Sequence, residues 1–234
     1  MLTSEQKERY TRQISIDSIG EEGQLRLSRS SALIVGVGGL GSPIATLLAS
    51  AGMGRIGIVD YDTVSLSNLP RQTIYTTSDI GQPKVECARQ RLSAMNPEVT
   101  IEVYNKRFDD ELADELVPQY DMVIDGCDNP STRYIIDRAA RRHSKPYVYG
   151  AIKEFEGLVS VFHYAGAGGY EDLFPEEHSP KSYSPPAVMA TTPAIIGAME
   201  ANEALKIAIG YGEVLSGKLL RFESVSYSLD IFDI

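Results

Sequence analysis

Four glycines in a short stretch are the strongest chemical signal in this chain. Gly36, Gly38, Gly39 and Gly41 follow a continuous apolar run and precede a segment with helical spacing. Glycines between a strand and a helix permit a tight turn, let a phosphate approach the backbone and place it at the positive end of the helix. The pattern therefore predicts a nucleotide-binding loop, and a glycine-rich turn without a ligand is the alternative.

An acidic residue follows this loop at the spacing of a nucleotide site. Asp60 lies 19 residues after Gly41, close to where nucleotide-binding βαβ units carry the acid that accepts a hydrogen bond from a ribose hydroxyl. Strand, glycines, helix and acid alone would favour NAD as the ligand. The residues that come next argue against NAD.

Two cations lie beyond the acid. Arg71 follows Asn68 by three residues, and Lys84 opens a predicted helix. A lysine at the start of a helix opposes the helix dipole and is unfavourable unless an anion lies beside it. Together the two cations could bind a triphosphate, which a hydride-transfer enzyme does not require. The alternative is that each is a solvated surface charge.

A further acid follows a second buried strand. The apolar run over 122–125 leads into Asp128 and Asn129, on the carboxyl side of the sheet, where ligands bind in open α/β folds. Asp128 could bind a Mg²⁺ ion that bridges phosphates, because hard cations take carboxylate oxygens. Both residues could also cap the helix that begins near Ser131. The two roles are compatible.

Alternating strands and helices are predicted to position these residues. Parallel strands are indicated by buried apolar runs, and helices by apolar residues at i, i+3, i+4 and i+7. After residue 158 the pattern favours an antiparallel meander. We therefore predict an α/β fold, a Rossmann-like doubly wound sheet with a parallel first half and antiparallel strands in the second half. The predicted strands are 32–37, 56–60, 100–103, 121–125, 147–149, 158–164 and 218–222, and the helices are 44–51, 84–95, 131–143 and 193–209.

The chain shows no linker that would divide it, so we predict a single domain over 1–234 with an N-terminal helical segment at 1–30. Residues 165–186 are rich in Gly, Ser, Pro and Glu and predict a long surface loop. Loops of this length inside compact domains are usually functional or disordered.

Composition narrows the class of protein. The 22 Lys and Arg residues against 32 Asp and Glu residues give a net charge of −10, which disfavours nucleic acid as a partner. No signal peptide and no apolar run near the ~20 residues that span a bilayer is evident. Cys87 and Cys127 are too few for a four-thiolate zinc site. We expect a cytoplasmic protein without a membrane segment.

Motifs along nearly the whole chain resemble the ThiF/MoeB/HesA group, the bacterial relatives of ubiquitin-activating enzymes. The resemblance rests on motifs in matching order. They are Arg9-Tyr10-Thr11-Arg12-Gln13, GVGGLGS from Gly36, VDYDTVSLSNLPRQ from Val59, IGQPKVE from Ile80, DGCDN from Asp125 and EANEALKIAIG from Glu200.

The resemblance implies ATP- and Mg²⁺-dependent adenylation of the C-terminal glycine of a small ubiquitin-like sulfur-carrier protein that ends in Gly-Gly. Pyrophosphate would be released, in thiamine or molybdopterin biosynthesis. Arg12 would reach into the partner subunit's site, which implies a homodimer. By the same resemblance, Arg12, Arg71, Lys84 and Asp128 are the expected catalytic residues, Asp128 would bind Mg²⁺, and the nucleotide would lie on Gly36, Gly38, Gly39, Gly41, Asp60, Asp62, Ser67, Asn68, Arg71, Gln72, Lys84, Asp128 and Asn129.

The chain departs from the group in two places. Members commonly carry two CxxC pairs that bind zinc, but here 169–172 reads GYED and the chain ends without the second pair, so we expect no zinc. Many members also carry a cysteine in the crossover loop, where 182–186 reads SYSPP. Cys127 could intercept an acyl-adenylate, or it is a small buried residue at a strand end.

Three other functions remain open. Some relatives activate a tRNA carboxylate, as in the formation of cyclic threonylcarbamoyladenosine, although the acidic charge speaks against RNA. A non-catalytic scaffold subunit is the second, yet a scaffold has no need of Arg71, Lys84 and Asp128. An NAD-dependent oxidoreductase is the most distant, because no second domain and no hydride-transfer acid is evident.

Overall fold

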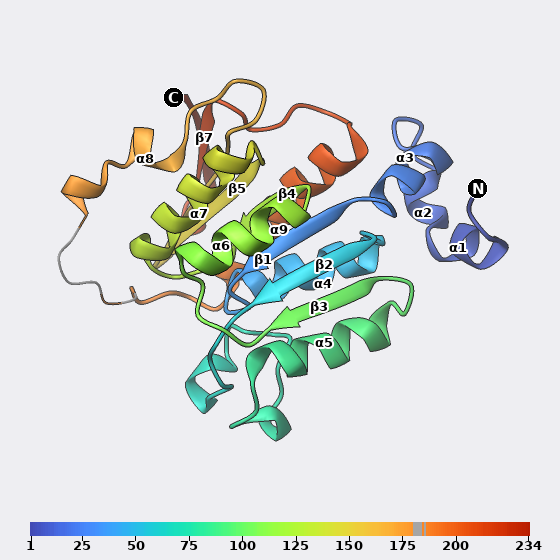
Figure 1. The fold of residues 1–234 in the computed structure, drawn as a ribbon, viewed down its shortest axis with the longest axis horizontal. Coiled ribbons are helices and arrows are strands. Elements are labelled where there is room, and N and C mark those ends of the chain that lie inside the picture. The colour runs from blue at the N-terminus through green and yellow to red at the C-terminus, as the bar shows by residue number, and fades with distance from the viewer. Residues whose placement is uncertain (180–183, 185) are drawn as a thin grey trace.

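The structure, a computed structural model, describes residues 1–179, 184 and 186–234. One mixed sheet runs through it in the order β3-β2-β1-β4-β5-β6-β7-β8 (Figure 1). The first five strands in this order pair in parallel and the remaining pairs are antiparallel, which confirms the predicted fold class. The strands are β1 (Ser31–Val35), β2 (Arg55–Val59), β3 (Thr100–Tyr104), β4 (Met122–Asp125), β5 (Tyr147–Lys153), β6 (Glu156–Phe162), β7 (Lys218–Glu223) and β8 (Ser228–Asp233).

Helices cover both faces of the parallel half. On one face α4, α5 and α9 enclose the larger apolar core, and on the other α6 and α7 enclose a second core. Every residue of β1 is buried, as expected for a parallel strand with helices on both sides. The helices are α1 (Ser4–Arg9), α2 (Thr11–Ile14), α3 (Gly20–Leu27), α4 (Gly41–Ala51), α5 (Lys84–Met95), α6 (Asp110–Leu116), α7 (Pro130–His143), α8 (Tyr170–Leu173) and α9 (Thr191–Ile209).

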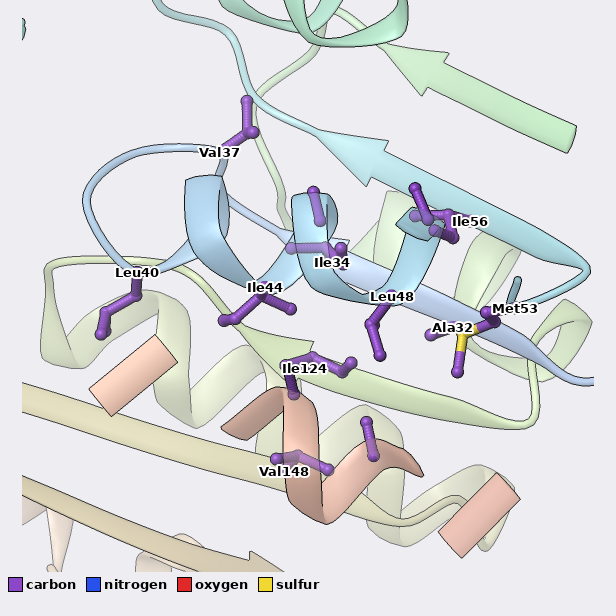
Figure 2. Close-up of a cluster of buried hydrophobic side chains, with 14 of the residues drawn as sticks. Ala32, Ile34, Val37, Leu40, Ile44, Leu48, Met53, Ile56, Ile124 and Val148 are labelled. Carbon is purple, nitrogen blue, oxygen red and sulfur yellow. The ribbon is translucent and has the colours of Figure 1, made fainter. Parts of the chain in front are cut away.

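The helix that follows the glycine loop is held by the larger core. Figure 2 shows Ile44 and Leu48 of α4 among Ile34 of β1, Ile124 of β4 and Val148 of β5. All five side chains are fully buried, and burying an aliphatic side chain contributes about 1.5–3 kcal/mol. The spacing of Ile44 and Leu48 by one helical turn directs both toward the sheet. The start of α4 is thereby fixed against the ends of the central strands.

The predicted surface loop at 165–186 is wrong for its first part. Residues 170–173 form α8, a 3₁₀ helix η4 follows at Glu176–His178, and Tyr170 is buried. The Tyr170 ring packs against Tyr134, Tyr149 and Phe174 with centroid distances of 5.1–5.4 Å. This aromatic contact anchors the segment on α7 and β5. Residues 180–183 and 185 of the predicted loop lie outside the described residues.

None of the described helices is both long and apolar enough to cross a membrane.

Candidate nucleotide site

The glycine loop connects β1 to α4 and meets the end of β4. Gly36 has φ +91°, and a Cβ there would lie 2.6 Å from the Gly126 carbonyl oxygen. A Cβ at Gly41 or at Gly126 would collide with the Gly36 carbonyl oxygen. These three glycines are therefore required by packing, because they let two strand ends and the helix approach one another.

The two central glycines of the loop are less constrained by packing. A Cβ at Gly38 would lie 3.4 Å from Nε2 of Gln72, which is ordinary contact, and a Cβ at Gly39 would lie 3.2 Å from Cβ of Pro193 on α9. Neither residue has a positive φ. What these glycines provide is a bare backbone at the N-terminal end of α4, where a phosphate would be favoured.

Asp60 joins the end of β2 to the glycine loop. Its Oδ2 accepts the Val37 N–H at 2.9 Å, and its Oδ1 accepts the Asp62 N–H at 2.9 Å. Burial raises the pKa of Asp60, although the nearby Lys84 opposes the shift. A carboxylate has about four lone-pair sites, so Asp60 can still accept a ribose hydroxyl, as its spacing predicts.

Lys84 is a buried cation paired with an acid at the edge of the site. Its Nζ lies 2.9 Å from Asp62 Oδ2, and the Lys84 side chain is 6% exposed whereas that of Asp62 is 51% exposed. The Lys84 N–H also donates to the Asp62 carbonyl oxygen at 2.9 Å. The interpretation of Lys84 as a solvated surface charge is therefore wrong. Asp62 is the anion that a lysine at the start of a helix requires.

The loop between β2 and α5 presents a second cation. Arg71 Nη1 donates to the Ser67 carbonyl oxygen at 2.8 Å, and within the described residues it forms no ion pair. Asn68 Oδ1 accepts the Ser65 N–H at 3.1 Å, which shapes the short 3₁₀ helix η1 (Leu66–Asn68). Arg71 thus has a fixed backbone anchor and free guanidinium donors, as a phosphate-binding arginine needs.

Gln72 adds an unpaired acceptor beside the loop. The side chain is 4% exposed, and Oε1 has no hydrogen-bond partner among the described residues. Its Nε2 faces Gly38. A buried polar atom without a partner is costly.

The sequence left helix capping and metal binding open for both Asp128 and Asn129, and the structure distinguishes the two residues. Asn129 caps α7, because its Oδ1 accepts the Thr132 N–H at 2.9 Å and the Ser131 hydroxyl at 2.7 Å. Asp128 is exposed and receives only a 3.4 Å hydrogen bond from Asn129. Its carboxylate is therefore available as an oxygen ligand, two residues beyond the glycine contact at Gly126.

A metal site made by protein side chains alone is not evident. Residues 1–179, 184 and 186–234 contain no group of three or more His, Cys, Asp or Glu side chains placed to hold an ion. Mg²⁺ in nucleotide enzymes commonly takes one or two carboxylates together with substrate phosphates, which fits a single open acid such as Asp128. The absence of zinc stays a prediction.

Cys127 lies next to Asp128 but lacks the character of a nucleophile. Burial, and then the nearby Asp125 carboxylate, raise the pKa of the Cys127 thiol well above its usual value. The thiolate is the reactive form, so this environment favours the structural interpretation. Cys87 on α5 is buried as well, and burial raises the pKa of its thiol too.

Arg12 lies at the far end of the domain from the glycine loop. Its neighbour Gln13 donates from Nε2 to the Ala51 carbonyl oxygen at 3.1 Å, at the C-terminal end of α4. The 11 residues of α4 span about 16 Å at 1.5 Å per residue. Figure 1 likewise places α1, α2 and α3 away from the arrowheads of β2 and β3. The structure therefore does not bring Arg12 to the site of its own chain.

Sequence reasoning missed two candidate residues, Asp125 and Arg133, which form a buried ion pair. Asp125 is 0% exposed, and its Oδ2 accepts from Arg133 Nε at 2.8 Å and from the Tyr147 hydroxyl at 3.0 Å. The available signal was an acid at the end of a buried strand with an arginine eight residues later. This pair lies directly beneath the loop that carries Asp128.

Comparison with known proteins finds one matching family and several similar sequences. The model of the ThiF family matches residues 10–234. The chain is 43% identical over 234 residues to a sulfur carrier protein adenylyltransferase of Thermus thermophilus, covering 97% of this chain and 86% of that protein. It is 42% identical to a probable molybdopterin-synthase adenylyltransferase of Porphyra purpurea (98% and 61% covered). It is 39% identical to the probable adenylyltransferase/sulfurtransferase MoeZ of Mycobacterium tuberculosis (97% and 60% covered). The chain thus spans 61% and 60% of the length of the last two relatives.

Solved structures agree on the architecture. A crystal structure of PaaA has a TM-score of 0.86 at 26% identity, with 100% of this chain and 75% of that chain covered. Escherichia coli MccB in a complex with AMPCPP and MccA has a TM-score of 0.85 at 23% identity, with 96% and 71% covered. The likeness to MccB shows the fold alone.

Proposed function

The chain belongs to the ThiF family and is an enzyme that adenylates, and from that premise we propose that it activates the C-terminal glycine of a ubiquitin-like sulfur-carrier protein. ATP would be the second substrate and pyrophosphate the product. The observation that carries the proposal is the set of contacts around one glycine loop. Asp60 accepts the Val37 N–H of that loop, the cation Lys84 pairs with Asp62 beside it, and Arg71 directly precedes Gln72, whose side chain faces Gly38. The names of the relatives support this acceptor.

The reaction requires charge stabilisation rather than an enzyme nucleophile. A carboxylate oxygen of the carrier forms a bond to the α-phosphorus of ATP while the bond to the β-phosphate oxygen breaks. Negative charge spreads over the α-phosphate and the leaving pyrophosphate. Fixed cations beside that charge lower the barrier, and this is the role we assign to Arg71 and Lys84.

Lys84 is held ready for this role by Asp62. Their 2.9 Å ion pair holds the ammonium in place before the triphosphate is bound. Because Asp62 is half exposed, water partly screens the pair, and an incoming phosphate can share the Lys84 donors. Asp128 would hold Mg²⁺, which supplies neutralisation of the triphosphate charge.

Arg12 is proposed to complete the site of a partner subunit in a homodimer. Its position at the opposite end of α4 from its own glycine loop supports this proposal, because only another copy could bring it near. Mixing Arg12→Ala with Arg71→Ala subunits should restore about a quarter of wild-type activity, since half of randomly mixed dimers are heterodimers with one intact site each. No recovery in dimers shown to exchange would refute the role in trans.

The segment 165–186 is proposed to cover the carrier tail, with α8 anchored on α7 and β5 through Tyr170. Thiamine and molybdopterin synthesis are both compatible with the relatives' names. ATP–pyrophosphate exchange with a panel of small proteins that end in Gly-Gly tests the proposal. Exchange that requires one of them would support carrier adenylation and identify the partner, whereas ATP binding without any carrier-dependent exchange would refute it in favour of another acceptor.

A further inference from the structure

A buried ion pair supports the loop that carries Asp128. Asp125 ends β4, and Arg133 lies on the first turns of α7. The Arg133 Nε lies 2.8 Å from Asp125 Oδ2, with the two side chains 10% and 0% exposed. Removing one member of a buried pair leaves an uncompensated charge in the protein interior. The pair is therefore a fixed part of the framework and too enclosed for either member to contact ATP.

The pair holds one residue of the loop from both sides. The Cys127 N–H donates to Asp125 Oδ1 at 2.9 Å, and Arg133 Nη2 donates to the Cys127 carbonyl oxygen at 3.4 Å. The same Nη2 donates to the Gly150 carbonyl oxygen of β5 at 3.1 Å. The peptide that enters Asp128 is thus tied to α7 and to the neighbouring strand.

The residue on the other side of this peptide contacts the glycine loop. Gly126 is packed so closely on Gly36 that either would collide with the other if it had a side chain. The loop between β4 and α7 therefore lies between the glycine loop and the buried pair. A displacement of Cys127 would change where the Asp128 carboxylate stands relative to a phosphate on the glycine loop.

We propose that Asp125 and Arg133 are positioning residues for the adenylation step: they fix the Cys127 peptide so that Asp128 holds its metal in register with the triphosphate. This inference rests on the proposed function, in that it gives Asp128 the role of metal ligand. The exposed Asp128 has no ion pair of its own within the described residues, so its placement depends on its backbone. Misplacement by about 1 Å can cost 10²-fold in rate.

Asp125→Asn is the first test, because it keeps the shape of the side chain and removes the charge. We expect kcat to fall about 10- to 100-fold, with ATP affinity measured without Mg²⁺ unchanged within about twofold. The strengthening of ATP binding by Mg²⁺ should shrink toward that of Asp128→Ala. Arg133→Lys should lie between Asp125→Asn and wild type, because a lysine cannot reproduce the fork of donors.

A double variant separates positioning from stability. Asp125→Asn with Arg133→Met leaves no unpaired buried charge, so its melting temperature should recover relative to the single Arg133→Met variant. Its kcat should stay low. Recovery of kcat together with stability would show a merely structural role and overturn the proposal.

Two matched controls complete the experiment. Tyr147→Phe removes the 3.0 Å hydrogen bond to the same Asp125 oxygen without touching Cys127. Arg138→Met removes an α7 arginine that pairs with Glu171 at 2.9 Å, away from the loop. Both should keep kcat within about twofold. A folded Asp125→Asn variant with wild-type kcat and full enhancement of ATP binding by Mg²⁺ would also overturn the proposal.

The Mg²⁺ dependence of ATP binding requires no carrier protein. If wild-type protein showed no exchange with any carrier, the proposed acceptor would fail, while the effect of Asp125→Asn on Mg²⁺-dependent ATP binding would still decide the positioning role.

Discussion

The strands β2 and β4 both lead into the site, and an aspartate lies at each, Asp60 just after β2 and Asp125 at the end of β4. The two aspartates differ in which carboxylate oxygens remain free. Asp60 and Asp125 each accept the backbone N–H two residues ahead at 2.9 Å. The second oxygen of Asp60 accepts one backbone N–H from the glycine loop, whereas that of Asp125 is taken by Arg133 and Tyr147. Asp125 is the last residue of β4 and in register with Val35 of β1, whereas Asp60 lies one residue past β2, whose Val59 is in register with Val35. A shift of one residue turns a side chain to the opposite face of a sheet, so one acid is left able to accept a ligand and the other is committed to the framework.

The difference follows from where the nearest cation lies. Lys84 pairs with the half-exposed Asp62 rather than with Asp60. Arg133 is buried against Asp125 itself. The buried Arg133 commits Asp125 to the framework, whereas the cation beside Asp60 is paired with another acid and leaves the Asp60 carboxylate with free lone pairs.

The largest expected difference is in stability. Asp125→Ala should lower the free energy of unfolding by about 3–5 kcal/mol, because Arg133 is left buried and unpaired. Asp60→Ala removes two hydrogen-bond acceptors and should cost about 1–3 kcal/mol. Urea denaturation of both variants measures the comparison. Equal losses would show that Asp60 belongs to the framework as much as Asp125 does.

The next largest effect is expected for Asp128→Ala. Adenylation should fall about 10²- to 10³-fold, because the charge of the triphosphate is no longer compensated. Stability should be unchanged, since Asp128 is exposed and accepts one long hydrogen bond. Initial rates of pyrophosphate exchange at saturating ATP provide the measurement. A rate within tenfold of wild type would contradict the role assigned to Asp128.

Asp60→Asn should weaken ATP binding about tenfold, the value of one hydrogen bond to a charged group. The side chain keeps its shape, and kcat at saturating ATP should change little, because the ribose is remote from the reacting phosphorus. Titration calorimetry with ATP and its 2′,3′-dideoxy analogue checks the claim. If the variant still distinguished the two nucleotides as wild type does, Asp60 would not contact the ribose.

The smallest expected effect concerns Glu200, a buried acid without a cation of its own among the described residues. Glu200 on α9 is 0% exposed, both its carboxyl oxygens lack partners within the described residues, and it lies against Gly150. Burial, reinforced by Asp125, raises the pKa of Glu200 well above its usual value. Arg133 opposes this shift but is paired with Asp125.

The pH dependence of stability follows from the sign of this shift. Folded protein keeps the Glu200 proton where unfolded protein has lost it, so the free energy of unfolding falls as the pH rises above the unfolded value of about 4.3. The slope from this group is of order 1 kcal/mol per pH unit until the folded pKa is passed. Glu200→Gln should remove that slope with kcat intact. An unchanged slope would show that Glu200 is ionised in the folded state.

Features of the fold that depend on neighbouring residues in the sequence could be predicted, and features that depend on contacts between distant segments could not. The strand–glycine–helix unit was predicted, because apolar runs, glycines and helix starts act locally along the chain. The roles of Asp60 and Lys84 in binding a nucleotide stay predictions. The helices α6 and α8 were not predicted. Tyr170 buries itself only because rings from α7, β5 and β6 meet it, and no local pattern records such a contact.

The candidate site shows the same division. The sequence alone does not distinguish Gly36 from Gly38. Gly36 is required by packing because Gly126 lies against it, whereas Gly38 has no such close neighbour and leaves its backbone open. Asp125 and Arg133 were missed because their pairing depends on the turn into α7. The location of Arg12 relative to the site depends on the direction of α4, which the sequence indicates only through its glycine loop.

Transfer of the α-phosphate to the carrier is the central claim, and a single-turnover reaction with labelled ATP tests it most directly. The carrier should acquire label from α-³²P-ATP and none from γ-³²P-ATP, and the γ label should leave as pyrophosphate. Label from the γ-phosphate on the carrier, or release of ADP in place of pyrophosphate, would contradict adenylation.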